Sequence, residues 1–352
     1  MNKKSKLPSR LMLTPFSDCK ECPPPPEFVI DYLVPKKGTA ILVGTSGIGK
    51  STLALNAVIS VAFGGQFLEH SCEQGAAIFV NPELPKDVMM ERVWKMHEAL
   101  GYPTPDKSKS RDDNVYLFNI RGNSSSLAKI ADDLIADCEK RNISPKLIVF
   151  DSLYMFGKGD ENDVRQVTEN LNAITRVAEE TGAGIIITHH TTKGSQFNKA
   201  LIDRASGSSA YARYPDVQMF LGRLEPQDDK LGSPWRLEFS KTRLTETPDP
   251  INLRLNFPLH IADTSGVLDD VRYSEEKGVR KQAKLDSEKL LFDAHHAHWE
   301  EKAQDPTVDE LAERIGKPKN TVENWLRASQ NFEKYKIDGE KPHRVRLKDS
   351  AE

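Results

Sequence analysis

A glycine-rich stretch between an apolar run and a helical pattern is the strongest constraint on this chain's fold. The stretch "GTSGIGKST" spans 44–52, follows "TAILV" and precedes "LALNAVISVAF", which has helical periodicity. It matches the pattern G-x-x-x-x-G-K-[ST], whose fixed positions here are Gly44, Gly49, Lys50 and Ser51. The order of strand, glycine-rich turn and helix predicts a phosphate-binding loop in an α/β domain.

The residues of this loop have expected roles in holding a nucleotide. Glycines let backbone N–H groups turn inward around phosphate oxygens, and the N-terminus of the following helix adds its dipole. Lys50 reaches the outer phosphates, and the Ser51 hydroxyl is an expected ligand of Mg²⁺. The sequence therefore predicts ATP and Mg²⁺ as cofactors, with the nucleotide held by Gly44, Thr45, Ser46, Gly47, Ile48, Gly49, Lys50, Ser51 and Thr52.

Further apolar runs alternate with longer amphipathic segments between 28 and 263. These runs are "AAIFV", "LIVFD", "GIIIT" and "VQMFLG". Runs that are apolar on both faces suit strands covered on both sides, and their alternation with helices is typical of a mostly parallel sheet. This part of the chain is predicted to be one α/β domain.

Two carboxylates follow predicted strands. Asp151 closes the run "KLIVFD" and is the candidate second ligand of the metal, although an acid at a strand end could merely cap a loop. Glu83, in "AAIFVNPELP", is the candidate base for the attacking water. Carboxylates after strands are common, so the residues alone leave the role of Glu83 open.

Histidines and a pair of cations follow two other apolar runs. His189 and His190 could bind a metal, but without a nearby third ligand a polar contact that senses the terminal phosphate is favoured for His190. The stretch "WRLEFSKTR" ends in Lys241 and Arg243, which strand alternation places on one face. On this stretch alone, a solvated strand end explains the pair equally simply.

Composition limits the classes of partner. The 352 residues include 49 basic and 52 acidic side chains, so the net charge of -3 gives no global attraction to nucleic acid, and any such contact is local. There is no apolar run of about 18 residues and no secretory leader pattern, which predicts a cytoplasmic protein without a membrane partner. Cys19 and Cys22 form a C-x-x-C without a second pair, so free thiols are favoured over zinc.

The chain divides into four predicted segments. Residues 1–27 form a basic, Pro-rich arm, residues 28–263 the α/β domain, residues 264–283 a linker and residues 284–352 a small C-terminal domain.

The C-terminal segment has the pattern of a helix-turn-helix. Thr307 and Glu310 form a capping box, Gly316 ends the first helix, and Pro318 begins the next. The following "KYKIDGEKPHRVRLKD" is expected to form a hairpin, so this unit is predicted to be a winged helix. The "HHAH" at 295–298 is expected to serve surface and core packing.

The order of these parts resembles the RecA-fold ATPases of the hexameric helicase group. The similarity is greatest to the RepA-like plasmid and phage replicative helicases, with the DnaB-like enzymes as more distant relatives. In those proteins a phosphate-binding loop is followed by a catalytic Glu, a metal-linked Asp, a sensor and a paired Lys and Arg. The matching positions here are Gly44 to Ser51, Glu83, Asp151, His190, and Lys241 with Arg243.

The resemblance extends over roughly residues 28–245 and implies a RecA-like P-loop domain. It includes "LIDRASGSSAYARYPDVQMFLGR", which resembles the segment after the family's DNA-facing loop. The chain departs from the DnaB-like enzymes because it has no recognisable primase-binding domain and carries the predicted winged helix.

The resemblance also implies an assembly and a function. In such rings each nucleotide lies between subunits, and a neighbour's Lys and Arg reach the γ-phosphate. We therefore expect a homo-oligomer, a hexameric ring, that acts as a replicative DNA helicase of a plasmid, phage or mobile element, with a replication initiator or loader as a further partner. Single-stranded DNA would be contacted by Lys158, Arg165, Lys193, Lys199 and Arg204.

A second hypothesis is a RecA-fold ATPase that binds DNA as a regulatory module without unwinding it, with the winged helix choosing the site. DNA contact by the winged helix is left open, because Glu323 lies among its outward residues Lys319, Asn320, Asn324 and Arg327.

Overall fold

The computed structural model describes residues 15–102, 114–152, 164–191, 213–227, 231–274, 276–329, 331–335 and 344–347. The chain divides into a larger unit that ends at Val271 and a smaller unit that begins at Arg272.

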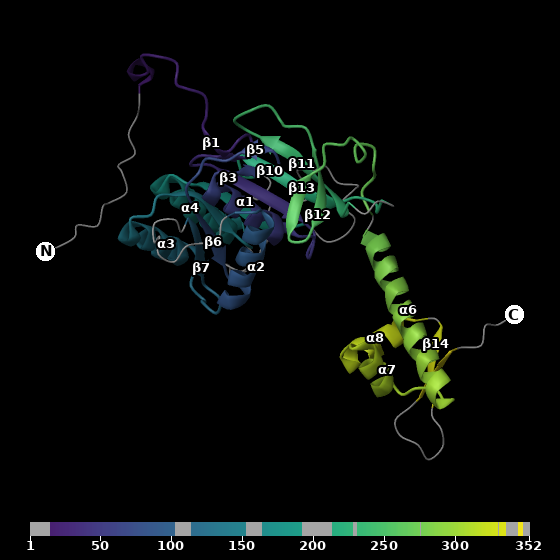
Figure 1. The fold of residues 1–352 in the computed structure, drawn as a ribbon. Coiled ribbons are helices and arrows are strands. Elements are labelled where there is room, and N and C mark those ends of the chain that lie inside the picture. The colour runs from purple at the N-terminus through teal and green to yellow at the C-terminus, as the bar shows by residue number, and fades with distance from the viewer. Residues whose placement is uncertain are drawn as a thin grey trace. The chain divides into compact units, whose positions relative to one another are not determined.

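A nine-stranded sheet forms the centre of the larger unit (Figure 1). Its strands are β3 Thr39–Gly44, β6 Ala76–Asn81, β7 Val115–Asn119, β8 Pro145–Phe150, β9 Gly184–His190, β10 Val217–Arg223, β11 Ser233–Thr242, β12 Ile251–Asn256 and β13 Leu259–Ala262. Two small hairpins pair β1 Phe28–Ile30 with β2 Val34–Pro35, and β4 Gln66–Phe67 with β5 His70–Ser71.

The sheet is mostly parallel, as predicted. Its order is β13-β12-β11-β10-β3-β9-β8-β6-β7. The pairs from β10 to β7 are parallel, whereas β11, β12 and β13 join one edge in antiparallel pairs. Each apolar run of the sequence forms one of the parallel strands, because strands covered on both faces need apolar side chains on both. This arrangement fits a RecA-like P-loop domain.

Helices connect the parallel strands: α1 Lys50–Phe63, α2 Lys86–Ala99, α3 Leu127–Arg141 and α4 Val164–Thr181. From β3 through α1 to β6, and through α2 to β7, the chain moves along the sheet in one direction. Through α3 to β8 and α4 to β9 it moves back. Right-handed crossovers therefore put α1 and α2 on one face and α3 and α4 on the other.

The described part of the smaller unit contains three helices and a two-stranded antiparallel sheet. Its elements are α6 Glu276–Lys302, α7 Val308–Ile315, α8 Lys319–Ala328, β14 Phe332–Tyr335 and β15 Arg344–Leu347. The predicted capping box between Thr307 and Glu310 is present, and Gly316 ends α7 with a φ of 69°. Helix α6 begins inside the stretch 264–283 that was expected to be a linker.

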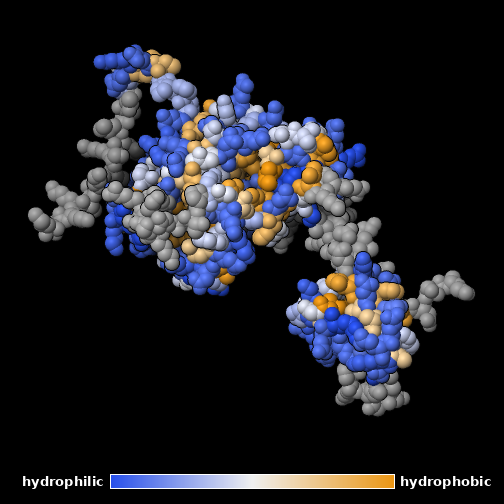
Figure 2. Space-filling model, viewed as in Figure 1, coloured by the Kyte–Doolittle hydropathy of each residue, from blue (hydrophilic) through white to orange (hydrophobic). Residues whose placement is uncertain are grey.

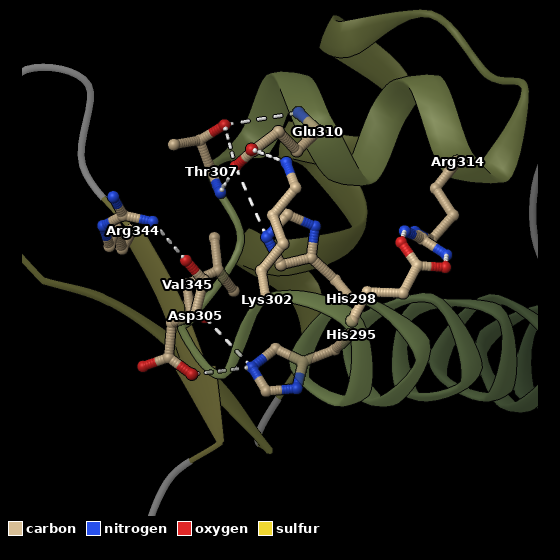
Figure 3. A network of polar contacts seen from close by, with 10 residues as sticks. His295, His298, Lys302, Asp305, Thr307, Glu310, Arg314, Arg344 and Val345 are labelled. Carbon is tan, nitrogen blue, oxygen red and sulfur yellow. Dashed lines mark hydrogen bonds and ion pairs between the residues drawn. The ribbon is translucent and has the colours of Figure 1, made fainter.

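A polar network joins α6 to the β-sheet of the smaller unit (Figure 3). His295 Nε2 lies 3.1 Å from both Asp305 Oδ1 and the carbonyl oxygen of Val345. The hydroxyl of Tyr335 donates to the other Asp305 oxygen at 2.8 Å. His295 and His298 are buried, as expected, and His296 is exposed. The structure thus gives His295 polar partners beyond the packing that the sequence indicated.

The surface of the larger unit is mostly polar. On the face drawn in Figure 2, hydrophobic residues gather around β12 and β13. Phe257, on the turn between these strands, is 76% exposed. Within the described ranges no helix has the length and hydropathy that crossing a membrane requires.

Candidate nucleotide-binding site

The predicted phosphate-binding loop joins β3 to α1, and glycine is required at both of its ends. Gly49 has a φ of 104°, in the left-handed region that favours glycine, and an added Cβ would lie 3.3 Å from the His260 ring. A Cβ at Gly44 would lie 3.0 Å from the carbonyl oxygen of Leu221. The loop therefore leads into α1 with the helix N-terminus, a favourable place for an anion, next to it.

Lys50, the first residue of α1, is folded back onto the end of β3. Its Nζ donates to the carbonyl oxygens of Gly44 and Thr45, both at 2.9 Å, and lies 3.3 Å from His190 Nδ1. The residue is 5% exposed. Burial lowers the pKa of Lys50 to about 8, and the charges of Asp151 and Glu83 oppose this shift.

The parallel pairing of β3 with β9 places His190 beside the phosphate-binding loop. Gly44 and His190 are partners in this pairing. Because a protonated Lys50 can only donate, His190 Nδ1 accepts and the neutral ring carries its proton on Nε2. Burial, followed by the charge of Lys50, lowers the pKa of His190, while Glu83 opposes.

Asp151 directly follows β8, the neighbour of β9. Its Oδ1 accepts a hydrogen bond from Thr188 Oγ1 at 2.5 Å. Burial raises the pKa of Asp151, whereas the hydrogen bonds from Thr188 and Ser51 oppose the rise. A carboxylate and a hydroxyl in contact offer the oxygen ligands that Mg²⁺ prefers, so Ser51 and Asp151 fit the predicted metal.

Glu83 lies in the turn after β6, on the far side of β8 from β9. Asn81 shapes this turn: its Oδ1 accepts from the Leu84 N–H at 3.0 Å, and its Nδ2 donates to the Leu84 carbonyl at 2.8 Å. Ser152 Oγ donates to Glu83 Oε1 at 3.0 Å. The carboxylate is thereby held next to Asp151.

These side chains meet around one cavity of about 310 Å³. The parallel order β3-β9-β8-β6 brings them there, since the carboxyl ends of these strands lie at the same edge. The cavity also contains Arg92, which the sequence analysis did not identify. Arg92 lies between the buried Met89 and Met96 on one face of α2, a spacing that turns it inward. The lining residues are Ser46, Gly47, Ile48, Gly49, Lys50, Ser51, Thr52, Glu83, Arg92, Asp151, Ser152 and His190.

A second cavity, of about 330 Å³, adjoins the first and shares Ser51, Thr52, Glu83, Arg92 and Asp151 with it. Most of its other lining is apolar and comes from α1, α2 and the β12–β13 turn. These residues include Leu55, Leu84, Val88, Met89, Met96, Phe257 and Pro258. A nucleotide whose phosphates contact the loop therefore has an apolar space nearby.

Lys241 and Arg243 lie together, as the sequence predicted, although simple alternation does not explain their direction. Trp235, Leu237 and Phe239 are buried, and unbroken alternation would put the two cations on their face. The pairing of β10 with β11 shifts at Ser240, which has no opposite residue in this register. A bulge of this kind redirects the following side chains, and both cations donate to the carbonyl oxygen of Arg213.

The cation pair does not reach the cavity of its own chain. Lys241 pairs with Gln218 near the start of β10, which runs parallel to β3. The pair is therefore at the amino ends of the parallel strands, whereas the phosphate-binding loop is at their carboxyl ends. The length of β3 between these edges is roughly 16 Å, more than an arginine side chain spans.

The candidate DNA-contacting cations are mostly beyond the described residues. Lys158, Lys193, Lys199 and Arg204 lie outside them, and Arg165 is near the start of α4. Cys19 and Cys22 are exposed free thiols. In the described part of the chain, no three His, Cys, Asp or Glu side chains are gathered in a way that could hold a metal.

Known proteins share both the fold and the nucleotide-site segment of this chain. Among solved structures, the ATPase domain of a phage helicase is similar over 64% of this chain and 85% of that domain, with 13% identity and a TM-score of 0.48. The family model described as "AAA domain" matches residues 5–196. This match includes the phosphate-binding loop, Glu83, Asp151 and His190, and it ends before the cation pair. The chain belongs to the AAA domain family.

Proposed function

We propose that this protein is an ATP-hydrolysing motor that forms rings and moves on single-stranded DNA, as RepA-like replicative helicases do. One observation carries the proposal. Lys50, Asp151, Glu83 and His190 border one cavity at the carboxyl ends of four adjacent strands, while Lys241 and Arg243 lie at the opposite edge of the sheet. One edge therefore suits binding a nucleotide, and the other suits reaching a neighbour's.

The cavity side chains have distinct roles in this account. Lys50 leaves its carbonyl partners and contacts the outer phosphates. Ser51 and Asp151 hold Mg²⁺, which when bound neutralises charge on the phosphate oxygens. Glu83 orients the attacking water and takes its proton, while His190 contacts the terminal phosphate. Arg92 adds a second positive charge to the same cavity.

The cation pair acts across a subunit interface in this account. A subunit that offers its nucleotide at one edge and its cations at the other makes a head-to-tail contact, which closes into a ring or continues as a filament. A hexameric ring would match the RepA-like resemblance. An arginine supplied by a neighbour contributes about 10³ to 10⁵ in rate by stabilising charge on the transferred phosphate.

Strand displacement on a forked DNA substrate tests the proposed function most simply. With ATP and Mg²⁺, the wild-type protein is expected to release the displaced strand, and Lys50→Ala is expected not to. Hydrolysis should rise with single-stranded DNA, and DNA affinity should fall steeply with salt while depending little on base sequence. ATP hydrolysis without strand release would contradict a helicase.

The smaller unit favours the second candidate, a regulatory DNA-binding ATPase. Its α7 and α8 follow each other as in a helix-turn-helix, and exposed Asn320, Asn324 and Arg327 lie on α8. A winged-helix role for this unit remains part of the proposal. Preference for one duplex sequence, with no response of hydrolysis to single strands, would support this candidate over the motor. Contact with an initiator or loader would be a further role of the same unit.

A further inference from the structure

Asp216 lies where the cation pair meets the strand that carries the phosphate-binding loop. Its Oδ1 is 3.5 Å from Arg243 Nη1. Its Oδ2 accepts from the backbone N–H and the hydroxyl of Thr39, at 2.8 and 3.3 Å. The backbone repeats these connections, since Asp216 N–H donates to Thr39 O at 2.9 Å and Asp216 O accepts from Arg243 N–H at 3.0 Å. Side chain and main chain therefore both join Arg243 to the first residue of β3.

The carboxylate also balances two neighbouring positive charges. Lys241 Nζ and Arg243 Nη2 donate to the same carbonyl oxygen, that of Arg213. Burial and then the charge of Arg243 lower the pKa of Lys241, whereas Asp216 opposes this. The Arg243 side chain is 48% exposed and that of Asp216 is 24% exposed. The guanidinium can thus meet another molecule while its carboxylate partner is largely covered.

The anchor of Asp216 is a rigid part of the fold. Every residue of β3 is buried, and the strand is paired with β9 on one side and β10 on the other. A side chain that is held against such a strand keeps one position relative to the sheet. Arg243, which directly follows the end of β11, has this anchor through Asp216.

We propose that Asp216 is a positioning residue for Arg243, holding the guanidinium against β3 so that it is presented to the nucleotide of a neighbouring subunit. This rests on the proposed function, in which Arg243 acts in trans. Asp216 itself does not touch the nucleotide. Its loss therefore lowers turnover and leaves the affinity for ATP unchanged.

Two substitutions separate positioning from folding. Asp216→Ala removes both contacts of the carboxylate, whereas Asp216→Asn keeps the volume and an oxygen acceptor for Thr39 but removes the charge. Both should lower kcat by about 10- to 100-fold, with KM for ATP unchanged, because misplacing a catalytic group by about 1 Å has effects of this size. Asp249→Ala, at an exposed aspartate between β11 and β12, is the matched control and should keep wild-type turnover.

Mixed assemblies identify the site through which Asp216 acts. Asp216→Ala subunits retain an intact cavity, so mixing them with Lys50→Ala subunits, which retain Asp216 and Arg243, should restore hydrolysis. Wild-type turnover of Asp216→Ala, lowered ATP affinity, or no restoration in mixed rings would overturn the proposal. Loss of folded structure in both variants, measured by circular dichroism, would also overturn it, since Asp216 would then be structural.

A parallel mixture keeps this proposal separate from the function on which it rests. Arg243→Ala subunits are mixed with Lys50→Ala subunits under the same conditions. No restoration in this mixture would contradict a trans role for Arg243. Restoration here, but not with Asp216→Ala, would contradict only the positioning role of Asp216.

Discussion

Ser152 Oγ donates a hydrogen bond to Glu83 Oε1 at 3.0 Å, across the ends of β8 and β6. Ser152 is 4% exposed, so this partner is fixed in the sheet, and it directly follows Asp151. The residue that would accept the water's proton is therefore tied to the segment that would hold Mg²⁺. This contact makes separate predictions for the two side chains.

Replacing the carboxylate should separate hydrolysis from binding. Glu83→Gln keeps the shape of the side chain but removes the proton acceptor, so steady-state hydrolysis should fall by about 10² or more. ATP affinity, measured with a fluorescent nucleotide, should stay near wild type. If affinity and turnover fell together, Glu83 would be structural and the base would lie elsewhere.

Removing the orienting hydroxyl should have a smaller effect in the same direction. Ser152→Ala deletes one hydrogen bond worth about 1 kcal/mol, which corresponds to about a fivefold loss of kcat. The pH profile of kcat should keep its shape, because Glu83 remains the base. A loss as large as that of Glu83→Gln would give Ser152 a role beyond orientation.

ATP affinity should depend on pH through Lys50. Burial lowers the pKa of Lys50 to about 8, so the ammonium that contacts phosphate is present below pH 8 and is lost above it. Above pH 8 the dissociation constant should approach a tenfold rise per pH unit. In Lys50→Arg the side chain stays charged, so whatever affinity remains should not vary with pH in this range. Calorimetric titrations from pH 7 to 9.5 check this, and a flat wild-type profile would contradict it.

A buried histidine beneath the phosphate-binding loop should make folding stability acid-sensitive. His260 is 3% exposed, and burial lowers its pKa to about 4. Between pH 4 and 6.5 the unfolded chain binds a proton that the folded protein excludes, so stability is lost as the pH falls through this window. Relative to wild type, His260→Leu should gain about 2 kcal/mol between pH 7 and pH 5. Urea unfolding at both values measures this, and an unchanged difference would contradict it.

The sequence predicted those parts of the site that depend on chain order. Strand, glycine-rich turn and helix locate the phosphate-binding loop because their chemistry is local. Glu83, Asp151 and His190 each follow an apolar run, so a parallel sheet brings them to one edge. Their roles came from the family resemblance and stay predictions.

Other features depend on tertiary pairing and could not be predicted in the same way. The shift at Ser240, which turns Lys241 and Arg243 off the buried face, arises from the pairing of β11 with β10. Arg92 had a signal, a cation at helical spacing between Met89 and Met96, but its meaning requires knowing that α2 borders the cavity.

The central claim is that hydrolysis requires residues from two subunits. An Arg243→Ala subunit has an intact cavity, and a Lys50→Ala subunit has an intact cation pair, so each alone should be nearly inactive. ATPase rates across mixing ratios, with ring formation checked by light scattering, measure the claim most directly. The account predicts activity that rises to a maximum at intermediate ratios, because some interfaces join an intact cavity to an intact Arg243. Uniformly inactive mixed rings would contradict it.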